Sequence, residues 1–115
     1  MAIMDDLTNK HCRPYDKNET PLNTKAVKSG VAQIPGWSAN QDCTEISRSF
    51  EFKNYYETMA FVNALAWIAH REDHHPDIEV GYKRCLVRYA THSIGGVSEN
   101  DFICAAKIDR ITEGA

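Results

Sequence analysis

Hydrophobic residues recur along the chain with two different spacings, and the change between them divides the sequence into helices and strands. Three stretches carry apolar residues at the three- and four-residue spacing of a helix: residues 23–34, residues 55–73 and the stretch that follows Ser98. Ser98 is a typical N-cap, with Asp101 in the capping-box position. The apolar stripe of the central helix is formed by Phe61, Val62, Leu65, Ile68 and Ala69. We expect this stripe to pack on a sheet.

Prolines mark where two of the predicted helices end. Residues 35–36 are Pro-Gly and stop the first helix. Pro76 disfavours a helical conformation in the residue before it, so the central helix should end near Asp73 or His74.

Other stretches have the pattern of strands. Residues 46–53 alternate with a period of two, which places Ile46, Phe50 and Phe52 on one face. Residues 78–82 and 84–92 are predicted to be two further strands. In the last one the inward side chains should be Cys85, Val87, Tyr89 and Thr91, and the outward ones Arg88 and His92. Trp37 is expected to anchor a short first strand.

The predicted order is therefore helix, two strands, helix, two strands, helix (α-β-β-α-β-β-α). Paired strands with short links favour an α+β two-layer sandwich, in which a four-stranded antiparallel sheet carries the helices on one face. The other face should meet solvent or another subunit. At 115 residues and 43% hydrophobic, the chain is long enough for one domain. We expect this domain at residues 21–115, after a polar, partly disordered arm at residues 1–20.

Composition excludes several classes of function. The net charge of −3, with 13 basic and 16 acidic residues, provides no basic patch for direct nucleic-acid binding. No apolar run reaches the roughly 18 residues of a membrane span. The amino end lacks the pattern of a signal peptide, and the four cysteines form no CxxC pair. We therefore expect a cytoplasmic protein with free thiols.

The candidate chemistry is concentrated in residues 72–76, Glu-Asp-His-His-Pro, at the predicted end of the central helix. The negative end of the helix dipole and the two carboxylates favour a protonated imidazole, whereas a second positive imidazole beside it disfavours one. One of His74 and His75 could then be charged while the other is neutral. Such a pair suits general acid and general base catalysis near neutral pH.

A second stripe on the same helix has helical spacing and polar character. It consists of Asn63, Trp67, His70 and His74. It is equally compatible with a solvated helix face. His70 and His74 lie one helical turn apart and form an alternative metal-binding pair, but no HExxH glutamate accompanies them and His75 and Pro76 interrupt the helix. A metal role for His11 and Cys12 lacks a second ligand pair.

The residues that could take part in catalysis or binding together resemble the signature of the pterin-4a-carbinolamine dehydratase family. The matching pattern is His70-x3-His74-His75-Pro76-x5-Tyr82-x9-His92-x8-Asp101. The resemblance extends from about residue 23 to residue 109. Two positions depart from the family pattern: His70 stands where Glu is common, and Ile78 stands where an aromatic residue is frequent.

The resemblance implies dehydration of 4a-hydroxytetrahydrobiopterin to quinonoid dihydropterin, without a cofactor. It implies acid, base and substrate-holding roles for His74, His75 and His92. Substrate contacts are predicted for His70, Asp73, Pro76, Tyr82, Thr91 and Asp101. Asp101 could orient His92, bind the pterin or cap the last helix, and Tyr82 could line the pocket or simply pack.

The resemblance also implies partners. A homodimer or homotetramer is expected, together with a functional link to an aromatic amino-acid hydroxylase whose pterin product would be recycled. The alternative from a different class is a protein-interaction or transcription-cofactor module, since animal members of the family act as dimerisation cofactors. Nothing in the sequence marks a surface for such a role.

Overall fold

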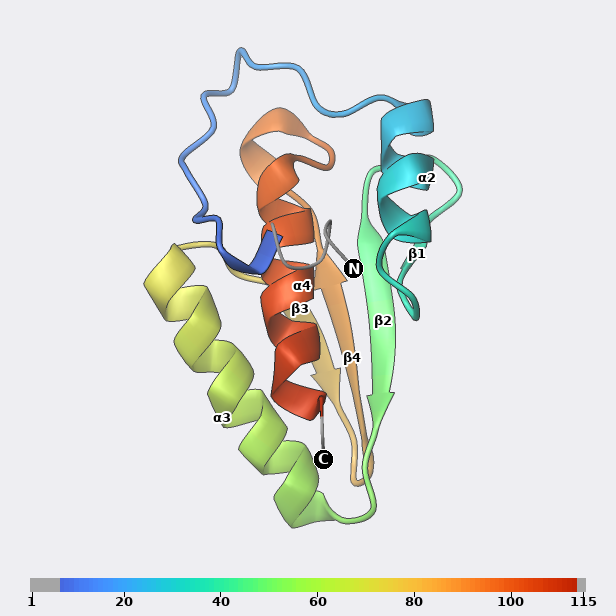
Figure 1. The fold of residues 1–115 in the computed structure, drawn as a ribbon, viewed down its shortest axis with the longest axis vertical. Coiled ribbons are helices and arrows are strands. Elements are labelled where there is room, and N and C mark those ends of the chain that lie inside the picture. The colour runs from blue at the N-terminus through green and yellow to red at the C-terminus, as the bar shows by residue number, and fades with distance from the viewer. Residues whose placement is uncertain (1–6, 114–115) are drawn as a thin grey trace.

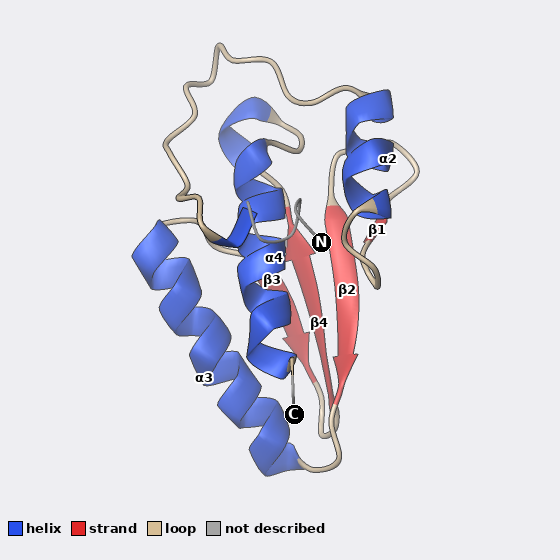
Figure 2. Cartoon of the chain, in the orientation of Figure 1, coloured by secondary structure: helices blue, strands red, loops and turns tan. Residues whose placement is uncertain are grey.

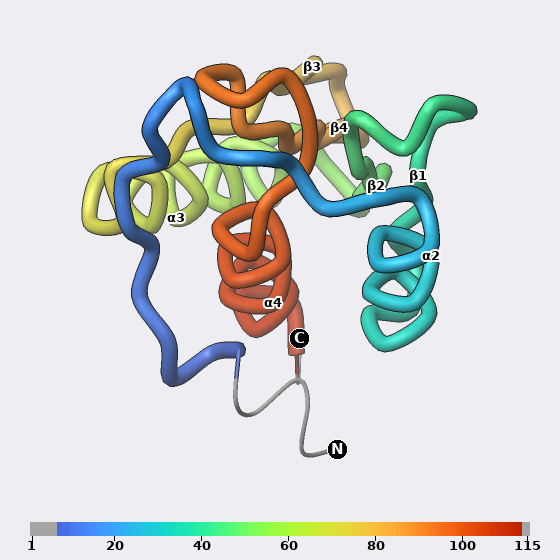
Figure 3. The backbone as a smooth tube through the Cα atoms, turned by 90° about the horizontal axis from the view of Figure 1, so that it is seen from above, coloured from blue at the N-terminus to red at the C-terminus, as the bar shows by residue number. Residues whose placement is uncertain are grey.

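A computed structural model describes residues 7–113 of the chain. The first six residues of the predicted arm and residues 114–115 lie outside this range. The described elements follow the predicted order and form the predicted α+β fold (Figure 1). Figure 2 distinguishes its helices from its strands, and the view from above shows the helices on one side of the sheet (Figure 3).

Each main helix begins at a side-chain cap. Asn23 precedes α2 (Thr24–Ala32), and its Oδ1 accepts a hydrogen bond from the backbone N–H of Ala26 at 2.8 Å. Asn54 does the same for α3 (Tyr55–Glu72). Ser98 and Asp101 form the predicted capping box of α4 (Glu99–Thr112). Because caps satisfy N–H groups that have no partner inside the helix, they explain where these helices start.

The sheet is antiparallel, with strand order β1-β2-β4-β3. Its strands are β1 (Ser38–Ala39), β2 (Ile46–Glu51), β3 (Asp77–Val80) and β4 (Arg84–Tyr89). In β4 the inward residues Cys85, Val87 and Tyr89 are fully buried, as the alternation predicts. The edge strand β3 is exposed along its whole length.

The strands are shorter than predicted. Phe52 leaves β2 and donates its backbone N–H to the carbonyl of Lys83 at 2.7 Å, in the connection to α3. After β4, Thr91 forms only an isolated bridge with Gly96, and the 3-10 turn η1 (His92–Ile94) follows. The prediction that the last strand extends to His92 is therefore wrong, because the chain turns back there toward the start of α4.

A buried polar contact ties α4 to the sheet. Asp109 accepts hydrogen bonds from Trp37 Nε1 and from the guanidinium of Arg48, each at 2.9 Å. Helix α4 also packs along α3. Among residues 7–113, none of the helices combines the length and apolar character needed to cross a bilayer.

Candidate active site

The end of α3 directs His74 toward α4. Asp73 adopts the left-handed conformation, with φ of 52°, and the N–H of His74 donates to the carbonyl of Ala69 at 3.1 Å. This is the pattern of a Schellman-type C-cap, which reverses the chain within one residue. His74 therefore leaves the helix face that carries His70, and its side chain is only 12% exposed.

His74 forms the central contact of the site with Asp101. Its Nε2 lies 2.6 Å from Oδ1 of Asp101, whose side chain is completely buried. Since a carboxylate only accepts hydrogen bonds, Nε2 carries the proton. In the described part of the chain Nδ1 of His74 has no hydrogen-bond partner. In the neutral ring this nitrogen holds a free lone pair and can accept a proton.

A directed chain of hydrogen bonds supports the Asp101 carboxylate. Its Oδ2 accepts from Thr91 Oγ1 at 2.8 Å and from the backbone N–H of Ser98 at 2.9 Å. Because the Thr91 hydroxyl proton is used in this way, Ser98 Oγ donates to Thr91 Oγ1 at 2.6 Å. Ser98 Oγ in turn accepts from the N–H of Asn100. The carboxylate is thus fixed in place before any substrate binds.

The surroundings of His74 favour its charged form. Burial disfavours the imidazolium, but the hydrogen bond and negative charge of Asp101 outweigh it and raise the pKa of His74 above its ordinary value of 6.5. The imidazole also stacks on Tyr89, with ring centroids 5.3 Å apart and an interplanar angle of 16°. This packing fixes the plane of the ring.

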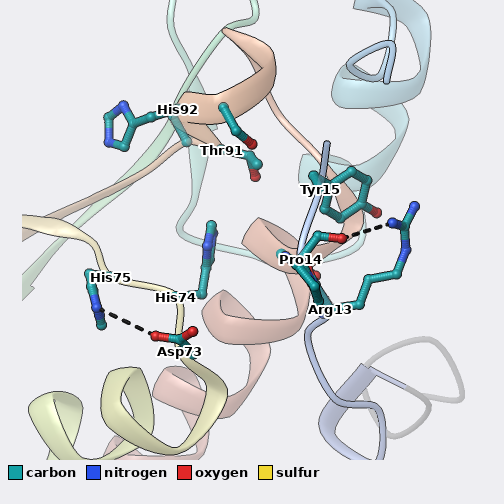
Figure 4. Close-up of a pocket in the computed structure, with 11 residues that line it drawn as sticks. Arg13, Pro14, Tyr15, Asp73, His74, His75, Thr91 and His92 are labelled. Carbon is teal, nitrogen blue, oxygen red and sulfur yellow. Dashed lines mark hydrogen bonds and ion pairs between the residues drawn. The ribbon is translucent and has the colours of Figure 1, made fainter. Parts of the chain in front are cut away.

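His74 opens into a pocket of about 330 Å³. The lining comes from three parts of the chain: the arm, the end of α3 and the segment around η1 and the first turn of α4. The lining residues are Arg13, Pro14, Tyr15, Asp73, His74, His75, Ala90, Thr91, His92, Ser93 and Asn100. Figure 4 shows His75 and His92 on one side of His74 and the arm residues on the other.

His75 and His92 occupy the open side of this pocket. The His75 side chain is 69% exposed, and its Nε2 lies 4.0 Å from a carboxylate oxygen of Asp73. His92 is also exposed, at the start of η1. Three imidazoles from two distant segments therefore surround one hollow, with one buried and two accessible to solvent.

The sequence of this site-bearing domain matches a known family. The family model described as pterin 4 alpha carbinolamine dehydratase matches residues 20–111, most of the chain. The chain belongs to the pterin-4a-carbinolamine dehydratase family. The match contains the entire histidine pattern, and the arm residues that line the pocket precede it.

Relatives within this dehydratase family are similar over nearly their whole length. A Nitrosospira multiformis protein is 56% identical over 110 residues, covering 96% of both chains. A Nitrosomonas europaea protein is 54% identical over 112 residues, covering 96% of this chain and 97% of the relative. Their names assign them only provisionally as pterin-4-alpha-carbinolamine dehydratases.

Solved structures share the dehydratase fold. The crystal structure of a transcriptional coactivator/pterin dehydratase from Brucella melitensis has a TM-score of 0.76 and 33% identity, covering 80% of this chain and 98% of that one. A pterin dehydratase-like protein described as a RuBisCO assembly factor in the alpha-carboxysome has a TM-score of 0.61 and 22% identity, covering 71% and 95%. At that identity the second likeness concerns the fold alone.

The structure brings some of the predicted site residues together and leaves others apart. His74, His75, His92, Asp73 and Thr91 line the pocket. Asp101 lies directly behind His74, hydrogen-bonded to this histidine, while Pro76 follows the histidine pair without lining the hollow.

His70 and Tyr82 lie away from the pocket. His70 is on the exposed face of α3, where its ring is 5.3 Å from that of Trp67. Tyr82 is in the turn between β3 and β4, stacked on Tyr55 with centroids 6.3 Å apart and 67% exposed. Both keep their predicted substrate roles only as predictions, without a contact to this site.

Sequence reasoning missed the arm residues and Asn100. Residues 13–15 carry no periodic signal, and only their non-local contacts place them at the pocket. Asn100 occupies the first turn of α4 and could have been noticed as an amide next to Asp101. Within residues 7–113, no group of three metal-ligating side chains is present, so neither His11 with Cys12 nor His70 with His74 gains a third ligand.

Proposed function

We propose that this protein dehydrates 4a-hydroxytetrahydropterins, with 4a-hydroxytetrahydrobiopterin as the expected substrate, to quinonoid dihydropterin and water. The observation that carries the proposal is the buried His74–Asp101 pair, opening into a pocket shared with two further imidazoles. Family membership supports the same reaction. The proposed reaction requires no cofactor.

The reaction breaks the bond between C4a and its hydroxyl oxygen. A proton must reach that oxygen so that it leaves as water, and a ring proton must be removed as the new double bond forms. His74 can perform one transfer through Nδ1, because Asp101 holds Nε2 protonated and stabilises the imidazolium. His75 and His92 are the candidates for the other transfer. Each positioned acid or base contributes about 10²–10⁴-fold.

The proposal extends to the setting of the reaction. Its product would be the pterin recycled to an aromatic amino-acid hydroxylase. The exposed edge strand β3 offers unpaired backbone groups, and Ile78 and Val80 on it are 37% and 44% exposed, which supports a homodimer or homotetramer. Four free cysteines support a reducing, cytoplasmic compartment.

A second candidate function is protein interaction. The description of the Brucella melitensis structure includes transcriptional coactivation. Two exposed aromatic side chains stacked on each other, Tyr55 and Tyr82, are compatible with a binding surface remote from the pocket. Binding to a helical partner that survives combined His74→Ala and His75→Ala substitution would favour this role.

The test follows the decay of authentic 4a-carbinolamine with and without the protein. His74→Gln keeps an amide N–H that can reach Asp101 but cannot exchange a proton near neutral pH, so we expect activity to fall by about 10²-fold or more. His75→Ala should also lower it strongly, with little change in the thermal transition because His75 is largely exposed. If the variant that combines His74→Ala and His75→Ala is as active as the unaltered protein, the histidine assignment is wrong.

A matched control removes an exposed ring outside the pocket. Tyr56 is 83% exposed and does not line the hollow. Tyr56→Ala should therefore retain full activity. If the unaltered protein fails to accelerate the decay, the proposed function is wrong.

A further inference from the structure

One wall of the pocket comes from the N-terminal arm, which precedes the family match. Arg13, Pro14 and Tyr15 line the hollow together with His74 and His92. The family match begins only at residue 20. The histidines therefore do not complete this pocket, and the arm supplies the part of its surface that lies on the other side of His74 from His75 and His92 (Figure 4).

Asn100 fixes the arm at the start of this wall. Its Oδ1 accepts from the backbone N–H of Arg13 at 3.1 Å, and its Nδ2 donates to the carbonyl of Arg13 at 2.6 Å. One side chain thus pairs with both backbone groups of one residue. Asn100 is itself buried in the first turn of α4, directly before Asp101 in the chain. Its two bonds to Arg13 therefore fix the position of Arg13 relative to Asp101.

Two further attachments hold the segment on either side. The N–H of Cys12 donates to the largely buried carboxylate of Glu72 at 2.7 Å, one residue before Asp73. The N–H of Leu22 donates to the carbonyl of Val97 at 2.9 Å, just before the α4 cap. The arm is therefore attached beside both chain segments that carry the His74–Asp101 pair.

The segment between these attachments is also held internally. The Arg13 guanidinium donates to both carboxylate oxygens of Glu19, at 3.2 and 2.9 Å. It also lies over the ring of Tyr15, 3.8 Å from the centroid. Glu19 accepts from the N–H of Asp16 as well. These contacts give residues 13–15 a defined shape before substrate binds.

We infer that residues 13–15 form a substrate-contacting wall and that Asn100 is a positioning residue for it. The inference rests on the proposed function and names the part of the site that would bind the bicyclic ring. The side-chain rings of Pro14 and Tyr15 offer a largely apolar surface to a flat heterocycle. Proton transfer belongs to the histidines. The wall should therefore control substrate binding more than the chemical step.

The direct test truncates the aromatic side chain. Tyr15→Ala should raise KM about 3- to 10-fold, the usual effect of losing one aromatic contact, with kcat changed less than about 2-fold. Tyr56→Ala is the matched control and should change neither constant. Unchanged KM in Tyr15→Ala, or an equal change in the control, would overturn the inference.

The positioning role has its own pair of variants. Asn100→Ala removes both bonds to Arg13, and we expect the same rise in KM with kcat nearly retained. Asn40→Ala is the matched control. The Asn40 side chain also makes two hydrogen bonds to the backbone, because its Oδ1 accepts from the N–H groups of Thr44 and Glu45, but it lies in the β1–β2 turn outside the pocket. A fall in kcat with unchanged KM would mean that Asn100 acts through Asp101 instead, which contradicts the inference.

Equilibrium binding separates this inference from the reaction itself. Binding of 7,8-dihydrobiopterin, a stable pterin, should weaken in Tyr15→Ala and Asn100→Ala but not in the two controls. If the unaltered protein shows no turnover, the proposed function fails. Weaker pterin binding by Tyr15→Ala and Asn100→Ala, but not by the controls, would still support the inference that residues 13–15 contact the ligand. Equal binding in all variants, or no binding by the unaltered protein, overturns it.

Discussion

Asp101 connects the structure of α4 to the chemistry of the pocket. As the acidic residue of the capping box it accepts the N–H of Ser98, and it holds the buried imidazole of His74 at 2.6 Å. The sequence left open whether this residue caps the helix, orients His92 or binds the pterin. In the structure its histidine contact is to His74, and the side chain has no exposed surface with which to touch a ligand.

Neutralising this carboxylate tests the pair at the scale of one residue. In Asp101→Asn the burial of His74 is no longer offset by a negative charge, so the pKa of His74 should fall. We expect the activity to drop by about 10²-fold or more, and the limb of the kcat/KM profile that belongs to His74 to move to lower pH. Dehydration rates measured across the pH range provide the check.

Thr91→Ser is the control for this substitution, because it keeps the hydroxyl that donates to Asp101. Because Thr91 also lines the pocket, the comparison concerns the position of the limb, which this variant should preserve. A limb that stays in place in Asp101→Asn would show that His74 does not titrate in that range.

At the scale of the element, the sequence predicted where α3 ends but not where His74 points. Pro76 predicted an end near Asp73 or His74, and the helix ends at Glu72 with Asp73 as its C-cap. Helical spacing alone puts His74 on the face of His70, and this would be right only if the helix continued. The left-handed Asp73 reverses the chain, and single-residue conformations of this kind leave no periodic signal.

The close packing of α2 on α4 explains why Gly30 stands inside α2, although glycine weakens a helix. A Cβ on Gly30 would lie 2.6 Å from Cε1 and 3.0 Å from Cε2 of Phe102. Although alanine has a higher helix propensity by roughly 1 kcal/mol, overpacking in a buried contact costs about 1–3 kcal/mol. We expect Gly30→Ala to lower the free energy of unfolding by about 1 kcal/mol, measured by urea denaturation.

Ser29→Ala is the control on the same helix, at an exposed position. It should raise stability by a few tenths of a kcal/mol through propensity alone. A stabilising effect of Gly30→Ala would mean that Phe102 can move away at little cost.

At the scale of the whole molecule, local patterns predicted the layers but not the pocket. Alternation and helical spacing are properties of neighbouring residues, and they placed the buried residues of β4 and the stripe of α3 correctly. The pocket depends on contacts across the chain, such as that of Asn100 with Arg13, 87 positions away. For the same reason Tyr82 fits the sequence pattern while lying in the turn between β3 and β4, stacked on Tyr55 and outside the pocket lining.

The stability of the whole protein should depend on pH through the same buried pair. The pKa of folded His74 is raised above 6.5, so its contribution to stability is fully present below about pH 6.5 and is lost as the pH rises through the folded value. Glu72 contributes in a different pH range. Its burial is outweighed by hydrogen bonds from Cys12 and His11, which lower the pKa of Glu72, so its contribution to stability is lost toward acid pH.

The difference in unfolding free energy between the parent protein and His74→Gln cancels the contribution of Glu72, which is common to both. It retains the contribution of His74 together with that of Cys104, whose pKa the charge of His74 helps to lower. We expect this difference to be largest below about pH 6.5 and to shrink as the pH rises through the folded pKa of His74, in urea denaturation at constant ionic strength. In an Asp101→Asn background the same difference should lose its slope, since the charge that raises the pKa is gone. A difference that grows with pH would mean that burial dominates and that His74 is neutral in the folded protein.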